Sequence, residues 1–125
     1  MTKRIVTLGE VMLRLKSPGF ERFFQSPMLE ATFGGGEANV AASLATFGLD
    51  AAFVTALPSN PIGDSAVRAL RALGVDTSYI IRQGERMGLY FLEAGANQRS
   101  SNVVYDRADS AISTAQPQDL SLIHI

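Results

Sequence analysis

The sequence predicts an α/β domain in which parallel strands alternate with helices and a small β lid lies beside them. Two segments, "TFGLDAAFVTAL" and "ALGVDTSYIIR", share one order: a helix end, a glycine, an apolar residue, an aspartate and then a strand. Repeating β-α units have this order. After Met87 the pattern changes to two strand-like runs joined by a polar loop, which predicts a hairpin. We therefore expect a partial parallel sheet with flanking helices plus a β lid.

The first strand is expected at residues 4–9, "RIVTLG", because a short β-branched run ended by glycine is typical of a buried strand. Residues 11–19, "VMLRLKSPG", alternate well enough for a half-exposed strand that ends in a turn at Pro18 and Gly19. Residues 20–27 carry three phenylalanines that we expect to pack under a loop, and no regular element is predicted there.

A helix is expected over residues 38–47, and its few polar residues predict that it is largely buried, with Gly48 as its C-cap. A strand at 51–57 follows. Residues 59–74 then predict a loop and a helix, with Asp64 in the first turn. The last strands are expected at 77–82 and in a hairpin formed by residues 87–95 and 100–107.

Composition excludes several classes of function. The chain has 125 residues, 46% of them hydrophobic, which suits one globular domain. Its net charge is -1 and its basic residues are scattered, so we expect no nucleic-acid partner. The absence of cysteine excludes disulfides, thiolate metal sites and a cysteine nucleophile. Glu10 and Arg14 interrupt any signal-peptide core and no run could span a bilayer, so we expect a cytoplasmic protein without a membrane partner.

The end of the sequence predicts a truncated protein. Residues 108–125 begin like a polar loop leading to a helix but stop before one can form, and a parallel sheet ending there would leave an open apolar edge. The last six residues, "LSLIHI", are what a transposon end used as a sequencing adaptor encodes, which predicts that residues 120–125 are an artefact. The alternative interpretation is an ordinary apolar strand.

The stretch "FGGGEANVAASLATFG", residues 33–48, is the strongest candidate site. It fits the dinucleotide fingerprint only in part and does not follow the first strand, and no Gly-Lys-Ser/Thr of a P-loop follows. Glycines at a helix N-terminus allow a ligand to approach main-chain N–H groups, and Glu37 and Asn39 could reach the same ligand. The alternative is a glycine turn with a helix cap.

Three segments, "TLGEVMLRL", residues 33–77 and "MGLYFLEAG", resemble the N-terminal half of a ribokinase-like (PfkB-family) sugar kinase. The specific piece is the Gly-Gly-x-x-x-Asn element followed by a helix and a "GD" loop. The resemblance implies that residues 1–119 are the N-terminal part of a kinase domain, with lid strands at approximately 11–34 and 87–107. It also implies ATP and Mg²⁺ for the full-length protein, a catalytic aspartate in a later Gly-x-Gly-Asp segment, and neither catalytic nor metal-binding residues in this chain.

Within that family the sequence is most similar to 2-keto-3-deoxygluconate kinases. Arg14 stands where neutral-sugar kinases usually carry aspartate, and an arginine suits an acid sugar. Glu37 takes a place more often held by Ala, Gly or Pro. Tyr90, Tyr105 and Arg107 fall at the positions by which such kinases hold the keto-acid. The resemblance implies a substrate-binding set, with Arg14 close to it: Gly34, Gly35, Glu37, Asn39, Tyr90, Tyr105 and Arg107.

The hairpin pattern gives a separate physical argument for part of this set. Tyr105 and Arg107 are two residues apart on one strand and share a face, and Tyr90 lies on the partner strand. A guanidinium can hold a carboxylate through two parallel hydrogen bonds. The alternative is an exposed flap with a solvated arginine and amphipathic tyrosines.

The resemblance implies that the full-length protein transfers the γ-phosphoryl of ATP to the primary hydroxyl of 2-keto-3-deoxygluconate, and that this chain alone is inactive. Three alternatives stay open: a fructokinase or other neutral-sugar kinase, a non-catalytic sugar-binding protein of the same fold, and, more distantly, a nucleotide-dependent dehydrogenase. A homodimer or higher homo-oligomer formed through the lid is compatible with an exposed strand edge.

Overall fold

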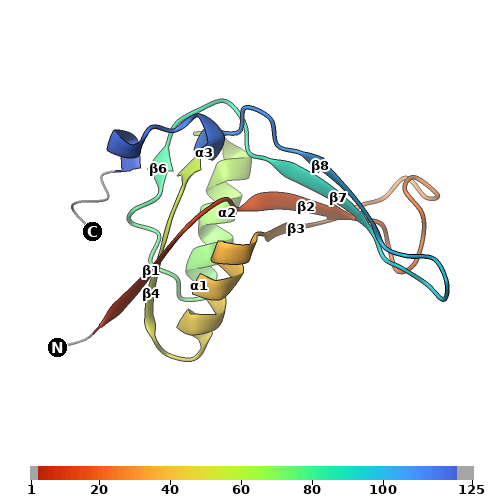
Figure 1. Cartoon of the computed structure of the whole chain (residues 1–125), viewed down its shortest axis with the longest axis horizontal. Coiled ribbons are helices and arrows are strands. Elements are labelled where there is room, and N and C mark those ends of the chain that lie inside the picture. Colours follow the sequence, from red (N-terminus) through yellow and green to blue (C-terminus); the bar gives the residue numbers. More distant parts are fainter. Residues whose placement is uncertain (1–2, 121–125) are drawn as a thin grey trace.

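The computed structural model describes residues 3–120. These residues form a core, from which a β sheet projects to one side (Figure 1). The first half contains β1 (Arg4–Leu8), β2 (Met12–Lys16), β3 (Glu30–Gly34), α1 (Gly36–Thr46), β4 (Asp50–Val54), β5 (Ala56–Leu57) and α2 (Pro61–Ala72). The second half contains β6 (Ile81–Arg82), β7 (Leu89–Glu93), β8 (Asn102–Asp106), α3 (Ala111–Thr114) and the 3₁₀ helix η1 (Pro117–Leu120).

The core consists of parallel strand pairs covered by α1 and α2. β1 pairs with β4 from Arg4 opposite Asp50 to Leu8 opposite Val54, and β5 pairs with β6. The parallel arrangement predicted from the repeated order of elements is therefore confirmed. Phe53 of β4 is fully buried in one cluster with Ala41 of α1 and Leu70 of α2. Burying a side chain of this size stabilises a fold by about 1.5–3 kcal/mol.

The expectation that the first helix is largely buried is wrong. Its buried residues are Ala38 and Ala41, whereas Val40 is 50% exposed and Phe47, which caps the helix, is 81% exposed. The two alanines belong to the main core cluster, which includes Phe53 of the neighbouring β4, and Ala42 and Ala45 are only partly buried against it. The C-cap is thus Phe47 and not the predicted Gly48, which follows it with a φ of +87°, a conformation that favours glycine directly after a helix.

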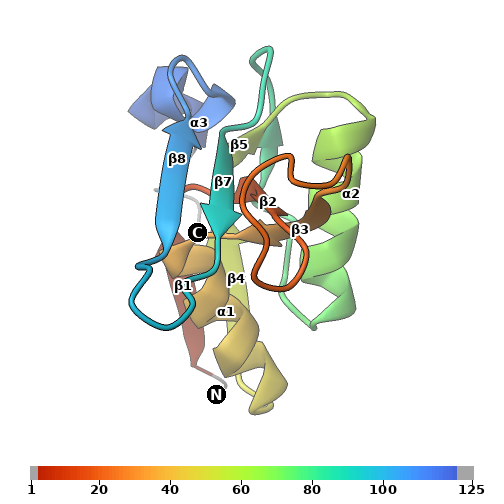
Figure 2. The ribbon, with the colours of Figure 1, turned by 90° about the vertical axis from the view of Figure 1, so that its right-hand side faces the viewer.

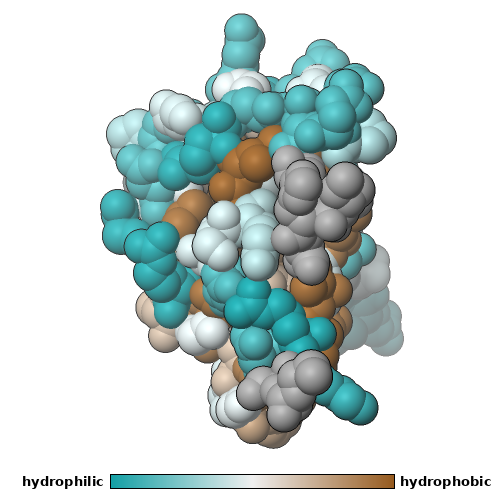
Figure 3. Space-filling model, turned by 90° about the vertical axis from the view of Figure 1, so that its left-hand side faces the viewer, coloured by the Kyte–Doolittle hydropathy of each residue, from teal (hydrophilic) through white to brown (hydrophobic). Residues whose placement is uncertain are grey.

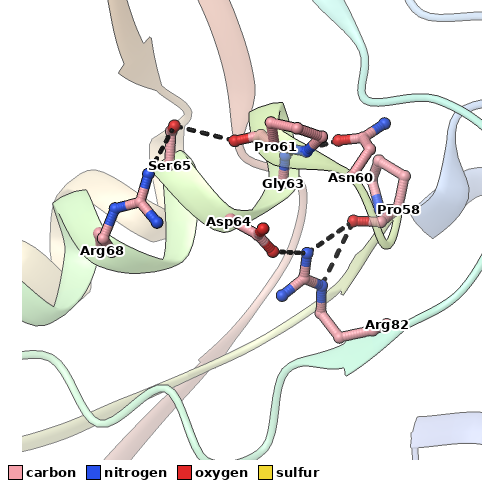
Figure 4. Close-up of polar contacts among 8 residues, drawn as sticks. All are labelled: Pro58, Asn60, Pro61, Gly63, Asp64, Ser65, Arg68 and Arg82. Carbon is pink, nitrogen blue, oxygen red and sulfur yellow. Dashed lines mark hydrogen bonds and ion pairs between the residues drawn. The ribbon is translucent and has the colours of Figure 1, made fainter.

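The start of α2 is fixed by a polar cluster (Figure 4). Asp64 lies in the first turn, as expected, and Asn60 caps the helix, because its side-chain oxygen accepts a hydrogen bond of 2.8 Å from the Gly63 N–H. Asp64 pairs with Arg82, which also donates to the carbonyl oxygen of Pro58 at 2.8 Å. The loop, the helix and β6 are thereby tied together.

Three expected elements differ from the structure. The strand expected at 51–57 is divided at Thr55 into β4 and β5. The strand expected at 77–82 shortens to Ile81–Arg82, because the Ile80 N–H donates to the Thr77 carbonyl and makes a turn. Near the chain end, α3 and η1 form where no complete helix was expected. Of the six residues predicted to be an artefact, Leu120 ends η1, and residues 121–125 lie outside the described part.

The β lid is a four-stranded sheet in the order β3-β2-β7-β8 (Figure 2). The predicted hairpin is confirmed, since β7 and β8 pair antiparallel. β2 runs parallel to β7 and antiparallel to β3. The short run at residues 30–34 was not predicted as a separate strand, because five residues following an irregular segment carry little periodicity.

Apolar side chains also reach the surface. On the side that lies at the left of Figure 1, hydrophobic patches are interspersed with hydrophilic ones (Figure 3). β1 exposes Ile5, Val6 and Leu8 by 37–44%. Among residues 3–120, none of the helices has both the length and the apolar character that a membrane span requires.

Candidate functional site

Three polar side chains form a row across one face of the lid. Arg14 of β2 stands opposite Tyr90 of β7, and Tyr90 stands opposite Tyr105 of β8. Directly paired residues on neighbouring strands share a face, so the three side chains lie side by side. The Tyr90 and Tyr105 ring centroids are 5.8 Å apart. Arg107, two residues after Tyr105, lies on the same face with its guanidinium carbon 5.9 Å from the Tyr105 ring centroid.

Gly34 makes room for this row. It is buried at the end of β3, and a Cβ atom placed on it would lie 2.7 Å from the Tyr90 hydroxyl oxygen and 3.8 Å from Cδ of Arg14. Any side chain at this position would displace the phenol. The glycine predicted from the sequence as a place of close approach is therefore in contact with the row.

Gly35, the N-cap of α1, brings the helix against the junction between β1 and β2. A Cβ atom on Gly35 would lie 2.2 Å from the carbonyl oxygen of Glu10, so the two backbones are in direct contact. The next residue, Gly36, has open space around its Cβ position. The N-terminus of α1, whose N–H groups favour anionic or hydroxyl-bearing ligands, thus begins beside the lid row.

Glu37 and Asn39 lie on α1, apart from the row. The Glu37 carboxylate packs over Gly9, where a Cβ atom would meet it at 2.5 Å. A carboxylate in the first turn also suits the positive end of the helix. Asn39 is exposed, and its backbone N–H donates to the Gly35 carbonyl at 2.8 Å. The structure therefore does not bring these two residues into the row formed by Arg14, Tyr90 and Tyr105.

Glu10 is the residue that sequence reasoning undervalued. Nη2 of Arg107 forms an ion pair with its Oε1 at 2.8 Å, and the side chain of Glu10 is only 11% exposed while that of Arg107 is 52% exposed. Oε2 of Glu10 is buried without a hydrogen-bond partner among the described residues. Its only signal in the sequence is a carboxylate directly after the strand-ending Gly9, a pattern that surface and capping residues also produce.

The row and the groups that contact it carry a net positive charge. Arg14 and Arg107 contribute two positive charges, and Glu10 contributes one negative charge. Arg107 has donors left over, because a guanidinium carries five N–H groups and Glu10 engages it through one nitrogen. The arrangement can therefore receive a carboxylate at Arg107 and hydroxyl or keto oxygens at the two phenols. Residues 3–120 contain no group of three or more His, Cys, Asp or Glu that could hold a metal ion.

Comparison with known proteins gives a consistent result. Residues 2–124 match the pfkB family carbohydrate kinases. The chain is 39% identical to the 2-dehydro-3-deoxygalactonokinase of Haloferax volcanii, over 98% of this chain and 38% of that protein. It is 59% identical to the crystal structure of the 2-dehydro-3-deoxygluconokinase of Thermotoga maritima, with a TM-score of 0.91 over 93% of this chain and 36% of that chain.

A solved structure with lower sequence identity has a similar fold. A sugar kinase of Pyrococcus horikoshii, crystallised in complex with ATP, is 22% identical with a TM-score of 0.82, over 92% of this chain and 37% of that chain. The present chain thus spans a little more than a third of the length of the relatives that it matches.

Proposed function

The chain belongs to the pfkB family of carbohydrate kinases, and from this premise we propose that the full-length protein phosphorylates 2-keto-3-deoxygluconate, the alternative name of 2-dehydro-3-deoxygluconate. The product would be the 6-phosphate, formed at the primary hydroxyl. The observation that carries the proposal is the row of Arg14, Tyr90 and Tyr105 with Arg107 beside it. Two phenols and two guanidinium groups on one face suit a substrate that combines hydroxyl groups with a carboxylate.

The proposed roles follow from the chemistry of each side chain. Arg107 would bind the substrate carboxylate through its solvent-facing N–H groups, a charge-assisted interaction that a neutral sugar cannot provide. Tyr90 and Tyr105 would hydrogen-bond to the keto and hydroxyl oxygens, and Gly34 would leave space for them. Main-chain N–H groups around Gly35, together with Glu37 and Asn39, would contact the remaining hydroxyl groups.

A second candidate substrate is 2-keto-3-deoxygalactonate, the epimeric acid. It is favoured by the 39% identity to the Haloferax volcanii enzyme named for that sugar. The two acids share the carboxylate that Arg107 would bind and differ in the configuration of one hydroxyl group. Discrimination between them therefore would depend on the hydroxyl contacts and not on the arginine.

We further propose that ATP and Mg²⁺ serve the full-length protein at residues outside this chain. ATP would supply the transferable γ-phosphoryl group, and the residues described here would bind and orient the sugar and shield it from water. The 125-residue sequence contains no Gly-x-Gly-Asp segment. We infer that this chain alone does not catalyse the transfer, and ATP-dependent turnover by the purified 125-residue chain would contradict that inference.

The experiment compares wild type and Arg107→Met in the full-length protein, with both keto-acids and fructose as substrates. Loss of a charge-assisted bidentate contact should lower kcat/KM for the acids by about 100-fold, while any turnover of fructose changes little. Arg86→Met is the matched control, since Arg86 pairs with Asp106 on the opposite face of the lid. Faster turnover of fructose than of either acid by wild type, or unchanged acid turnover in Arg107→Met, would overturn the proposal.

A further inference from the structure

We propose that Glu10 is a positioning residue that fixes the direction of the Arg107 guanidinium before the substrate binds. The inference rests on the proposed function, because the orientation matters for the acid end of the sugar. Glu10 lies between β1 of the core and β2 of the lid, whereas Arg107 follows β8 at the far edge of the lid sheet. Their ion pair of 2.8 Å therefore connects the junction of the two parts to the edge of the lid.

The packing around Glu10 indicates that the pair is built into the fold. A Cβ atom on Gly88 would lie 2.5 Å from Oε2 of Glu10 and 3.1 Å from Cβ of Arg107. A Cβ atom on Gly35 would lie 2.2 Å from the Glu10 carbonyl oxygen. Glycines on both sides thus leave the volume that the Glu10 side chain and backbone occupy, whereas an ordinary surface ion pair needs no such space.

The two partners of the ion pair differ in exposure, and this difference shows which partner is held in place by the fold. The Glu10 side chain is 11% exposed and the Arg107 side chain 52%, so the carboxylate is the fixed partner and the guanidinium keeps an outward edge. Every residue of β8 is exposed. Without Glu10, the arginine at the end of this strand would sample many rotamers, and substrate binding would have to pay for ordering it.

One competing interpretation predicts that removal of Glu10 strengthens substrate binding instead of weakening it. If the Glu10 carboxylate occupied the place of the substrate carboxylate, its removal would free Arg107 and strengthen binding. The ion pair joins Oε1 of Glu10 to Nη2 of Arg107 and leaves the other N–H groups of the guanidinium available for a substrate, which argues for positioning. Glu10→Ala removes the carboxylate, and Glu10→Gln keeps an acceptor without the charge.

The kinetic test uses the full-length protein and the keto-acid of the proposed function. For positioning, Glu10→Ala should raise KM about 10-fold or more with kcat changed less than about threefold, and Glu10→Gln should recover part of the loss. In an Arg107→Met background, Glu10→Ala should have no further effect. A lower KM in Glu10→Ala, or an equal loss with and without Arg107, would overturn the inference.

A second measurement does not depend on turnover. The ¹⁵N NMR signal of the Arg107 side-chain N–H, assigned by its loss in Arg107→Met, should be sharp in wild type and should broaden in Glu10→Ala. Glu85→Ala, at an exposed loop position, is the control and should leave the signal unchanged. Should wild type fail to phosphorylate either acid while Glu10→Ala broadens the signal, the proposed function fails and the positioning of Arg107 stands. An unchanged signal in a folded Glu10→Ala variant, judged by its thermal unfolding midpoint, overturns the inference.

Discussion

The core and the lid of this chain use β strands in opposite ways. Phe53 and Val54 of the core strand β4 are completely buried, whereas every residue of the lid strand β8 is exposed and Tyr105 reaches 59%. The core strand gains its stability from apolar contacts with α1 and α2. The lid strand lacks such buried apolar contacts, and its polar side chains stay accessible to a ligand. Substitutions should therefore affect folding in the core and binding in the lid.

The largest expected effect is in the core. Phe53→Ala should lower the free energy of unfolding by about 3–5 kcal/mol, because it leaves a cavity where both helices meet the sheet. Val104→Ala, on the lid at 47% exposure, should cost less than about 1 kcal/mol. Urea denaturation of the full-length protein measures both values. Equal losses would show that the lid is as tightly packed as the core.

A smaller effect is expected at the junction between the two parts. Gly35→Ala should cost about 1–3 kcal/mol of stability and raise KM for the sugar, since its methyl group would collide with the Glu10 carbonyl. Gly36→Ala is the matched control, because the space around that position is open and alanine favours a helix. Unfolding and steady-state kinetics of the two variants test this. If both behave alike, the close contact at Gly35 is unimportant.

The polar cluster at the start of α2 should contribute less. Arg82→Met removes the bonds to the Pro58 carbonyl and to Asp64, and we expect a loss of about 1 kcal/mol in the free energy of unfolding. Asp64→Asn should cost less than that, because the Asp64 side chain is 50% exposed and the solvent screens its ion pair. Neither variant should alter KM. A greater loss in Asp64→Asn than in Arg82→Met would contradict this order.

The smallest effect concerns pH. The side-chain O–H and backbone N–H of Ser78 donate to Asp76 and lower its pKa; burial opposes this shift, and Arg4 adds smaller contributions that also lower the pKa. A lowered folded-state pKa stabilises the fold above the unfolded value of about 4 and loses this contribution as the pH falls through the folded value. Asp76→Asn should thus be slightly less stable than wild type at neutral pH, and the difference should fade in acid.

Thermal unfolding of wild type and Asp76→Asn between neutral and acidic pH measures the difference in their stability. Ser78→Ala is the partial control, because it removes the hydroxyl donor but keeps the backbone one. A difference between wild type and Asp76→Asn that grows as the pH falls would contradict the expected sign.

Much of the fold could be predicted because its signals are local. Glycine-terminated apolar runs indicated the positions of β1, α1 and α2, and two strand-like runs joined by a polar loop indicated the hairpin in which Tyr90 stands opposite Tyr105. The burial of α1 could not be predicted. An apolar helix face indicates only that the helix can pack against another element. The position of the neighbouring strands determined that Ala38 and Ala41 are buried, whereas Val40 and Phe47 are exposed.

The sequence by itself determined the alternation of strands and helices, the glycine-rich helix start and the shared face of Tyr105 and Arg107, because each follows from periods of a few residues. Only the tertiary structure decided that Arg14 joins this face, that Gly34 admits the Tyr90 hydroxyl and that Glu10 meets Arg107. These contacts join residues far apart along the chain. Their register depends on how the lid strands pair and how closely glycine backbones approach, which no local pattern encodes.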